Sequence, residues 1–163
     1  MFKKLKNALG IHSKMIEIML PMAGVVIPVT QAKDPTFSEE MLGKGVAVLP
    51  SVGRVFSPIH GKVFQLFDTL HAISLVSEDG VELLIHIGMD TVQLKGKHFT
   101  AVVKTGDTIK VGDLLIEFNK DAILAEGFDL TTPVVVCNHS DYTKMDIQYQ
   151  STKAGDCLII LEK

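Results

Sequence analysis

Apolar and polar positions alternate in short runs along most of this chain. The runs are rich in β-branched residues and are separated by Gly, Pro, Asp or Asn. A period of two over such short runs is typical of β-strands that bury one face. The runs expected to form strands are residues 24–29, 44–50, 61–67, 71–77, 81–87, 100–106, 114–118, 132–138 and 157–163. The pattern therefore predicts an all-β fold.

Two stretches depart from this alternation and predict short helices. Residues 37–43 are expected to form a single helical turn, and residues 119–128 a longer helix, because charged residues there flank an apolar stripe. No low-complexity linker divides the chain. We therefore expect one domain over residues 19–163, preceded by a flexible basic leader at residues 1–18.

The leader has apolar side chains on one helical face and Lys3, Lys4 and Lys6 largely on the other. So short a helix is marginal on its own, so we expect a solvated segment that makes at most a weak peripheral contact with a membrane. The longest uncharged stretch has only 15 residues, from Ile18 to Ala32, and contains two prolines. A spanning helix needs about 20 apolar residues, so no membrane crossing is expected.

Two pairs of similar segments indicate an internal duplication. "PMAGVVIPV" (residues 21–29) and "PIHGKVFQL" (58–66) share P-x-x-G-x-V, and "VGDLLIEF" (111–118) shares G-D-x-L-I with "AGDCLIIL" (154–161). The glycines permit the tight turns that a small sandwich needs where strands pass between sheets. Biotinyl and lipoyl carrier domains use the same phrases, but their Met-Lys-Met or Asp-Lys-Ala lysine setting is missing here, and this chain is about twice the size such a domain requires.

Composition narrows the function further. The net charge is −3 and 21% of the residues are charged, which leaves no basic surplus for nucleic acid. Cys137 and Cys157 lack C-x-x-C spacing, so neither a disulfide framework nor a zinc knuckle is indicated. These features fit a protein of the reducing cytoplasm that has no nucleic-acid partner.

Two histidines flank a predicted hairpin in "HAISLVSEDGVELLIHIG". If its loop is centred between Glu78 and Asp79, opposed residue numbers sum to 157, and His71 faces His86 directly. Directly opposed Cβ atoms lie roughly 5 Å apart, so the imidazoles can touch. A lone histidine on an apolar strand is usually a core residue, but two neighbouring imidazoles are poor core design, because each ring needs polar partners. The pairing therefore favours a functional site.

Three chemistries use such a pair: metal binding, acid–base catalysis and acceptance of a phosphoryl group. A zinc hydrolase would use His71, His86 and Asp90. Phosphoryl acceptance needs a neutral ring with one free nitrogen, a fixed acceptor for the other nitrogen, and donors for the phosphoryl oxygens. The Gly88 backbone, Thr69, His71 and Thr91 could meet those needs.

From residue 21 to residue 163 the chain resembles the glucose-family enzyme IIA module of the bacterial phosphoenolpyruvate-dependent sugar phosphotransferase system. The resemblance rests on "DPTFSEEMLGKGVAVLPSVG", "SPIHGKV", "HAISL" and "GVELLIHIGMDTVQLKGKHF". The family's phosphohistidine, in the phrase H-x-G-x-D-T-V, falls on His86. Its second active-site histidine, in the phrase H-A-I, falls on His71, and Thr69 matches the threonine two residues before it.

The resemblance implies a duplicated barrel-sandwich hybrid that acts as a phosphotransferase component without a metal or cofactor. Phospho-HPr would donate to His86, whose ring a backbone carbonyl such as that of Gly88 would orient. His86 would then pass the group to a cysteine of a sugar-specific enzyme IIB. Regulatory proteins are possible further partners, which the sequence does not identify. A non-catalytic regulatory binding module with the same fold is the remaining alternative.

The resemblance also implies a docking rim around the histidines. Its apolar members would be Phe37, Phe67, Leu84 and Val92, and its charged members Asp34 and Asp90. Leu70 departs from the family pattern, because a more polar residue is expected beside His71. His12, His60, His98 and His139 are expected to be surface or turn residues.

Overall fold

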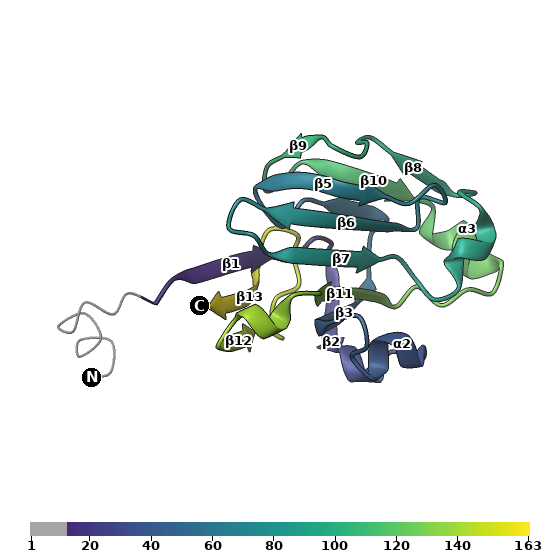
Figure 1. The fold of residues 1–163 in the computed structure, drawn as a ribbon. Helices are drawn as coiled ribbons and strands as arrows, with labels where there is room; N and C mark the ends of the chain where they lie inside the picture. Colours follow the sequence, from purple (N-terminus) through teal and green to yellow (C-terminus); the bar gives the residue numbers. More distant parts are fainter. Residues whose placement is uncertain (1–12) are drawn as a thin grey trace.

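The computed structural model describes residues 13–163, which form three antiparallel sheets (Figure 1). The largest sheet has seven strands in the order β2–β3–β11–β7–β6–β5–β9, and the two smaller ones have the orders β1–β13–β12 and β4–β10–β8. The strands are β1 (Met15–Met19), β2 (Gly24–Pro28), β3 (Lys44–Pro50), β4 (Arg54–Phe56), β5 (Gly61–Leu66), β6 (Ala72–Ser77), β7 (Glu82–His86), β8 (Phe99–Ala101), β9 (Thr108–Ile109), β10 (Leu114–Phe118), β11 (Thr132–Val136), β12 (Lys144–Ile147) and β13 (Cys157–Glu162). The all-β prediction is confirmed.

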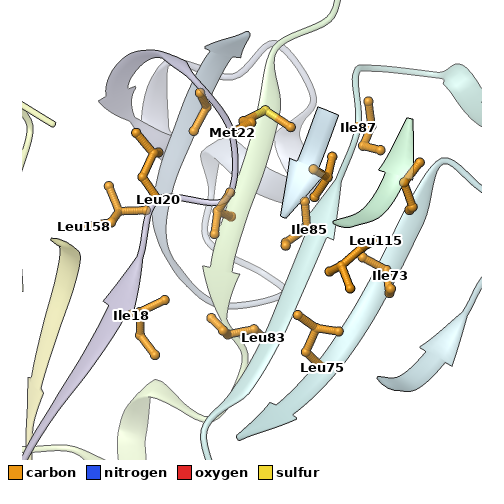
Figure 2. Close-up of a cluster of buried hydrophobic side chains, with 14 of the residues drawn as sticks. Ile18, Leu20, Met22, Ile73, Leu75, Leu83, Ile85, Ile87, Leu115 and Leu158 are labelled. Atoms are coloured by element: carbon orange, nitrogen blue, oxygen red, sulfur yellow. The ribbon is translucent and has the colours of Figure 1, made fainter. Parts of the chain in front are cut away.

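Alternating apolar residues build the core where the sheets face one another. On β6 and β7 the inward pairs are Ile73 with Ile85 and Leu75 with Leu83, which lie directly opposite across the ladder. Figure 2 shows these side chains converging with residues of other strands, among them Ile18 of β1. Burying each such side chain stabilises the fold by roughly 1.5–3 kcal/mol.

The two repeated motifs occupy equivalent positions, which confirms the duplication. The Met19 N–H donates to the Pro58 carbonyl at 3.0 Å, and reciprocally the Phe56 N–H donates to the Pro21 carbonyl at 2.7 Å. The second motif repeats the pattern, since the Leu20 N–H donates to Asp156 and the Ser57 N–H to Asp113, both at 2.7 Å. The two copies of each motif therefore make the same backbone contacts.

The glycines of the first motif are required where two strands approach closely. A Cβ on Gly24 would lie 2.2 Å from the Leu49 carbonyl oxygen, and one on Gly61 would lie 2.0 Å from that of Val76. Both distances are far shorter than any side chain tolerates, so larger residues would force the strands apart.

The boundary predicted after residue 18 is too late, because β1 begins at Met15. Most of the leader lies outside the described residues, but its last residues form β1, where Ile16 and Ile18 are buried against the pairing strand β13. The folded part therefore begins earlier than expected. The run "MIEIM" has the alternating pattern of a strand. Because it directly follows the basic segment, the prediction assigned most of it to the leader.

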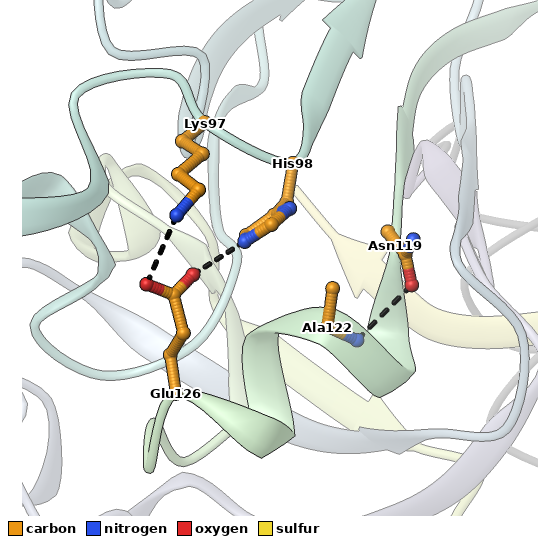
Figure 3. A network of polar contacts seen from close by, with 5 residues as sticks. All are labelled: Lys97, His98, Asn119, Ala122 and Glu126. Carbon is orange, nitrogen blue, oxygen red and sulfur yellow. Dashed lines mark hydrogen bonds and ion pairs between the residues drawn. The ribbon is translucent and has the colours of Figure 1, made fainter.

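The helices match the predictions in part. Helix α3 (Lys120–Ala125) lies inside the predicted range, and Asn119 caps it by accepting from the Ala122 N–H at 3.1 Å (Figure 3). Helix α2 (Pro35–Ser38) begins earlier than residue 37, because Asp34 caps its N-terminus and Pro35 fits the first turn. Three short 3-10 segments complete the fold: η1 (Val29–Gln31), η2 (Thr91–Leu94) and η3 (His139–Asp141).

A polar network ties the loop after η2 to the end of α3. The Lys97 amine and the His98 ring both contact the Glu126 carboxylate, the lysine at 3.3 Å (Figure 3). These contacts tie the loop between η2 and β8 to the end of α3. Over residues 13–163, no helix is long and apolar enough to cross a membrane.

Candidate functional site

His86 lies at the end of β7, with its ring half-buried and one nitrogen fixed. Its Nδ1 hydrogen-bonds to the Gly88 carbonyl oxygen at 2.8 Å. A carbonyl oxygen only accepts hydrogen bonds, so the proton of the neutral ring lies on Nδ1. This leaves Nε2 with its lone pair, as a nucleophile requires.

His71 lies immediately before β6 and is buried. Its Nδ1 is 2.6 Å from the Thr69 hydroxyl oxygen, and its backbone carbonyl accepts from the Ile87 N–H at 2.7 Å. The first contact fixes the ring, and the second fixes the backbone against the strand that carries His86. The four residues expected at the centre of the site, His86, His71, Thr69 and Gly88, are therefore brought together.

The two imidazole rings meet edge to face, with centroids 4.8 Å apart and planes at 88°. Phe37 packs against the His86 ring at 4.9 Å and Phe67 against the His71 ring at 5.9 Å, both between centroids. The aromatic rings exclude water from one side of each imidazole. The pair is therefore rigidly oriented in a partly apolar setting.

The predicted register of the hairpin is wrong by one residue. Ala72, not His71, lies opposite His86, because the loop holds three residues and brings the Ser77 N–H to the Val81 carbonyl. Gly80 makes this loop possible by adopting a left-handed φ of 86°.

The rings meet nevertheless because His71 lies outside the regular strand. Leu70 before it has a left-handed φ of 59°, which breaks the alternation that a continuous strand would impose. Asn tolerates this conformation better than Leu does. The left-handed backbone at position 70 therefore explains why a polar residue such as Asn is expected there, although this chain has Leu70.

Burial keeps both rings neutral at neutral pH. It lowers the pKa of His71 to about 4, and repulsion from His86 adds to the effect. Burial also lowers the pKa of His86, although the Gly88 carbonyl and the carboxylates of Asp34 and Asp90 act in the opposite direction. A neutral His86 has the free lone pair that phosphoryl acceptance needs.

Only some residues of the expected docking rim are exposed at the surface. Phe37 and Leu84 are buried, at 3% and 8% exposure, in a small apolar cluster with Ala72 and Met89, so they form a floor beneath the rings. They are buried because this cluster also gathers Val29 of η1 and Val135 of β11. Phe67 packs against the same cluster and is partly exposed.

The exposed part of the expected rim consists of Val92, Asp90 and Asp34. Val92 is 49% exposed and Asp90 is exposed, whereas Asp34 is half-buried. Asp34 and Asp90 line a hollow of about 520 Å³ beside the histidines, together with Lys33 and Asp129. Because Lys33 pairs with Asp129 at 3.7 Å, this hollow presents a surplus of negative charge.

The other histidines stand apart from this site. His60 is exposed, His139 begins η3, and His98 lies in the loop that contacts Glu126. His12 lies outside the described residues. Among residues 13–163, no group of three or more His, Cys, Asp or Glu side chains is arranged to hold a metal ion, so nothing supports the zinc-hydrolase alternative.

Sequence reasoning missed two residues that support the site. The backbone carbonyl of Asp129 accepts from the Met89 N–H at 2.8 Å, and the Thr132 hydroxyl oxygen accepts from the Gly88 N–H at 3.4 Å. Both come from the segment that enters β11, which lies beside β7 only in the folded sheet. No local pattern marks them.

Comparisons with known proteins agree with this geometry. Residues 16–142 match the family described as phosphoenolpyruvate-dependent sugar phosphotransferase system, EIIA 1. The chain is 39% identical over 161 residues to the PTS system glucose-specific EIIA component of Staphylococcus epidermidis, which covers 98% of this chain and 97% of the relative. The solved structure of glucose permease IIA from Mycoplasma capricolum superposes with a TM-score of 0.85 at 29% identity, over 90% of this chain and 96% of that one.

Longer relatives contain a similar segment. The PTS system beta-glucoside-specific EIIBCA component of Dickeya chrysanthemi is 50% identical over 122 residues, which are 75% of this chain. A second EIIBCA component, from Halalkalibacterium halodurans, is 47% identical over 148 residues. The chain spans only 19% and 23% of the lengths of these two proteins.

Proposed function

Because the chain belongs to the EIIA 1 family of the phosphoenolpyruvate-dependent sugar phosphotransferase system, we propose that His86 is its phosphoryl carrier. His86 accepts the group from phospho-HPr and passes it to the cysteine of a sugar-specific EIIB domain. The observation that carries this proposal is the hydrogen bond from His86 Nδ1 to the Gly88 carbonyl, which leaves Nε2 free. The EIIBCA relatives, whose names join the three components in one chain, support an EIIB acceptor.

In the first half-reaction, the lone pair of His86 Nε2 forms a new P–N bond as the P–N bond to the HPr histidine breaks. The leaving nitrogen keeps the electron pair, and the His86 proton stays on Nδ1, held by Gly88. In the second half-reaction, a cysteine thiolate attacks the phosphorus and His86 leaves as the neutral ring. The protein supplies mainly position and electrostatics to both steps.

His71 stabilises the transferring group. With the Thr69 hydroxyl donating to its Nδ1, the neutral ring carries its proton on Nε2 and donates that proton toward a phosphoryl oxygen. As negative charge gathers on the phosphoryl oxygens, this hydrogen bond strengthens. Interactions that strengthen in the transition state accelerate the transfer.

The negative hollow beside the histidines supports a basic docking partner. Asp34 and Asp90 lie at its edge next to His86, and Val92 offers an exposed apolar contact. Phe67 adds a partly exposed ring on the His71 side. We include these four residues in the surface that HPr and EIIB contact in turn, with Phe37 and Leu84 as its buried support. The two free cysteines fit action in the cytoplasm.

The test uses phosphoenolpyruvate, enzyme I, HPr and this protein, followed by intact mass spectrometry. The wild type is expected to gain one phosphoryl group, lost on acid treatment, whereas His86→Ala gains none. His60→Ala, which removes an exposed histidine away from the site, serves as the matched control and is phosphorylated like the wild type. A wild type that gains no mass while HPr is phosphorylated contradicts the proposal and favours the regulatory module.

A further inference from the structure

All four polar atoms of the two peptide groups on either side of Gly88 have hydrogen-bond partners. The Gly88 carbonyl accepts from His86, and the Met89 N–H donates to the Asp129 carbonyl at 2.8 Å. The Ile87 carbonyl accepts from the Thr91 hydroxyl, and the Gly88 N–H donates to the Thr132 hydroxyl oxygen at 3.4 Å. The Gly88 carbonyl, which orients His86, is thus flanked by backbone groups that are all hydrogen-bonded.

The two hydroxyls in this set are fully buried and point to the same short segment. Thr91 and Thr132 both have 0% exposure. The Thr132 hydroxyl donates its proton to the Leu130 carbonyl at 2.8 Å, so only its lone pairs face the Gly88 N–H. Thr132 therefore acts as a directed acceptor, and Thr91 as a directed donor, across one peptide group.

The segment has no room to adjust. Gly88 has a left-handed φ of 78°, and a Cβ there would lie 2.7 Å from the Thr91 methyl carbon and 2.8 Å from the Asp129 carbonyl oxygen. Thr91 and Thr132 hold the peptide group between Ile87 and Gly88. Gly88 joins this group directly to the next peptide group, whose carbonyl accepts from His86.

We propose that Thr91 and Thr132 are positioning residues for His86, which hold the Gly88 carbonyl so that the His86 proton stays on Nδ1 and Nε2 stays free. Neither hydroxyl has a hydrogen bond to a histidine, so both act through the backbone. The consequence for phosphoryl transfer rests on the proposed function. The consequence for the His86 tautomer does not.

The test is nitrogen-15 NMR of the His86 ring in unphosphorylated Thr91→Val, Thr132→Val and the double variant. Valine keeps the shape and removes the hydroxyl, whereas Thr91→Ser and Thr132→Ser keep it and serve as matched controls. In the wild type, Nδ1 carries the proton. In the valine variants we expect a measurable population with the proton on Nε2, and in the serine variants the wild-type tautomer.

Transfer kinetics provide the second readout. We expect acceptance from phospho-HPr to slow roughly tenfold in the double valine variant, with little change in KM for phospho-HPr. Thr132→Val alone is the safeguard against misfolding, because Thr132 begins a strand whose next buried residues are mainly valines. The His71 ring should keep its own tautomer, since neither threonine has a hydrogen bond to that ring.

The outcomes separate the two proposals. A shifted tautomer in the valine variants, together with a wild type that never accepts a phosphoryl group, supports the positioning role and overturns the proposed function. An unchanged tautomer in folded Thr132→Val and in the folded double variant, with wild-type transfer rates, overturns the positioning role and leaves the proposed function standing. A slower transfer without a tautomer change also overturns it, because a loss of rate alone reflects general destabilisation.

Discussion

His71 and His86 each have Nδ1 hydrogen-bonded within their own segment, to Thr69 and to Gly88, and their rings stand at 88° to one another. The Nε2 atoms are therefore the polar atoms of the pair that remain for a substrate. Because burial holds both rings neutral, one Nε2 is a nucleophile, and the other is a donor when the Thr69 hydroxyl donates to His71 Nδ1.

Mild acid should destabilise the fold through His71. Its pKa falls from 6.5 to about 4 on folding, so between these values the unfolded chain binds the proton and the native protein does not. Stability is therefore complete above pH 6.5 and decreases as pH falls toward 4. Between pH 7 and pH 5 the loss should be about 2 kcal/mol, with a further contribution of the same sign from His86.

Urea unfolding at the two pH values measures this loss. His71→Gln removes one titrating ring, so its unfolding free energy should depend less on pH than that of the wild type. Equal pH dependence in the two proteins would contradict the assignment to His71.

Phosphorylation of His86 should raise the pKa of His71. In the free protein a protonated His86 repels a proton on His71, whereas a phosphoryl group on His86 brings negative charge that attracts one. Proton NMR titration of the His71 ring before and after phosphorylation by HPr measures the change. A His71 pKa that stays at or below its value in the unphosphorylated protein would show that the ring does not face the phosphoryl group.

Gly88→Ala should impair both stability and transfer, and Gly80→Ala provides the matched control. Both glycines have a left-handed φ, of 78° and 86°, so both substitutions cost on the order of 1 kcal/mol of backbone strain. Only at Gly88 does the new Cβ meet other atoms, whereas at Gly80 nothing lies within 4 Å. Gly88→Ala should therefore lose more unfolding free energy and most of its transfer rate, whereas Gly80→Ala transfers normally. Stopped-flow phosphorylation with denaturant unfolding measures both effects, and equal transfer rates would rule out the role of the Gly88 carbonyl.

Thr69→Val should slow transfer while leaving the phosphoryl group on His86. Valine cannot donate to His71 Nδ1, so the neutral His71 ring loses its preference for a proton on Nε2. We expect roughly a tenfold slower onward transfer to EIIB, and Thr69→Ser should restore it. If the serine and valine variants transfer at the same rate, the hydroxyl has no part in orienting His71.

The sequence predicts most of the fold because most strands are short apolar runs bounded by turn residues. β6 and β7 are recognisable since each has apolar residues on both faces, bounded by turn residues. β4 and β9 are not predicted, because strands of three and two residues are too short to show an alternating pattern. β12 was missed because its side chains are only half-buried, which weakens the contrast between its faces.

The centre of the site was predictable for a different reason. His86, Gly88, His71 and Thr69 lie in two short segments joined by one hairpin, so local spacing brings them together even though the register was off by one residue. Thr132 reaches Gly88 only because β11 pairs with β7 in the folded sheet. The burial of Phe37 and Leu84 likewise depends on a cluster that gathers side chains from distant segments, which spacing along the chain does not encode.

The most direct test of this account is the atom that carries the phosphoryl group. The wild-type protein, labelled with nitrogen-15 and phosphorylated through enzyme I and HPr, is examined by phosphorus–nitrogen NMR and by fragmentation mass spectrometry. We predict one phosphoryl group on Nε2 of His86, and in His71→Gln the same adduct formed and released more slowly. A phosphoryl group on His71, or on Nδ1 of His86, would contradict the account, because the first reverses the two roles and the second requires the hydrogen bond to Gly88 to be broken.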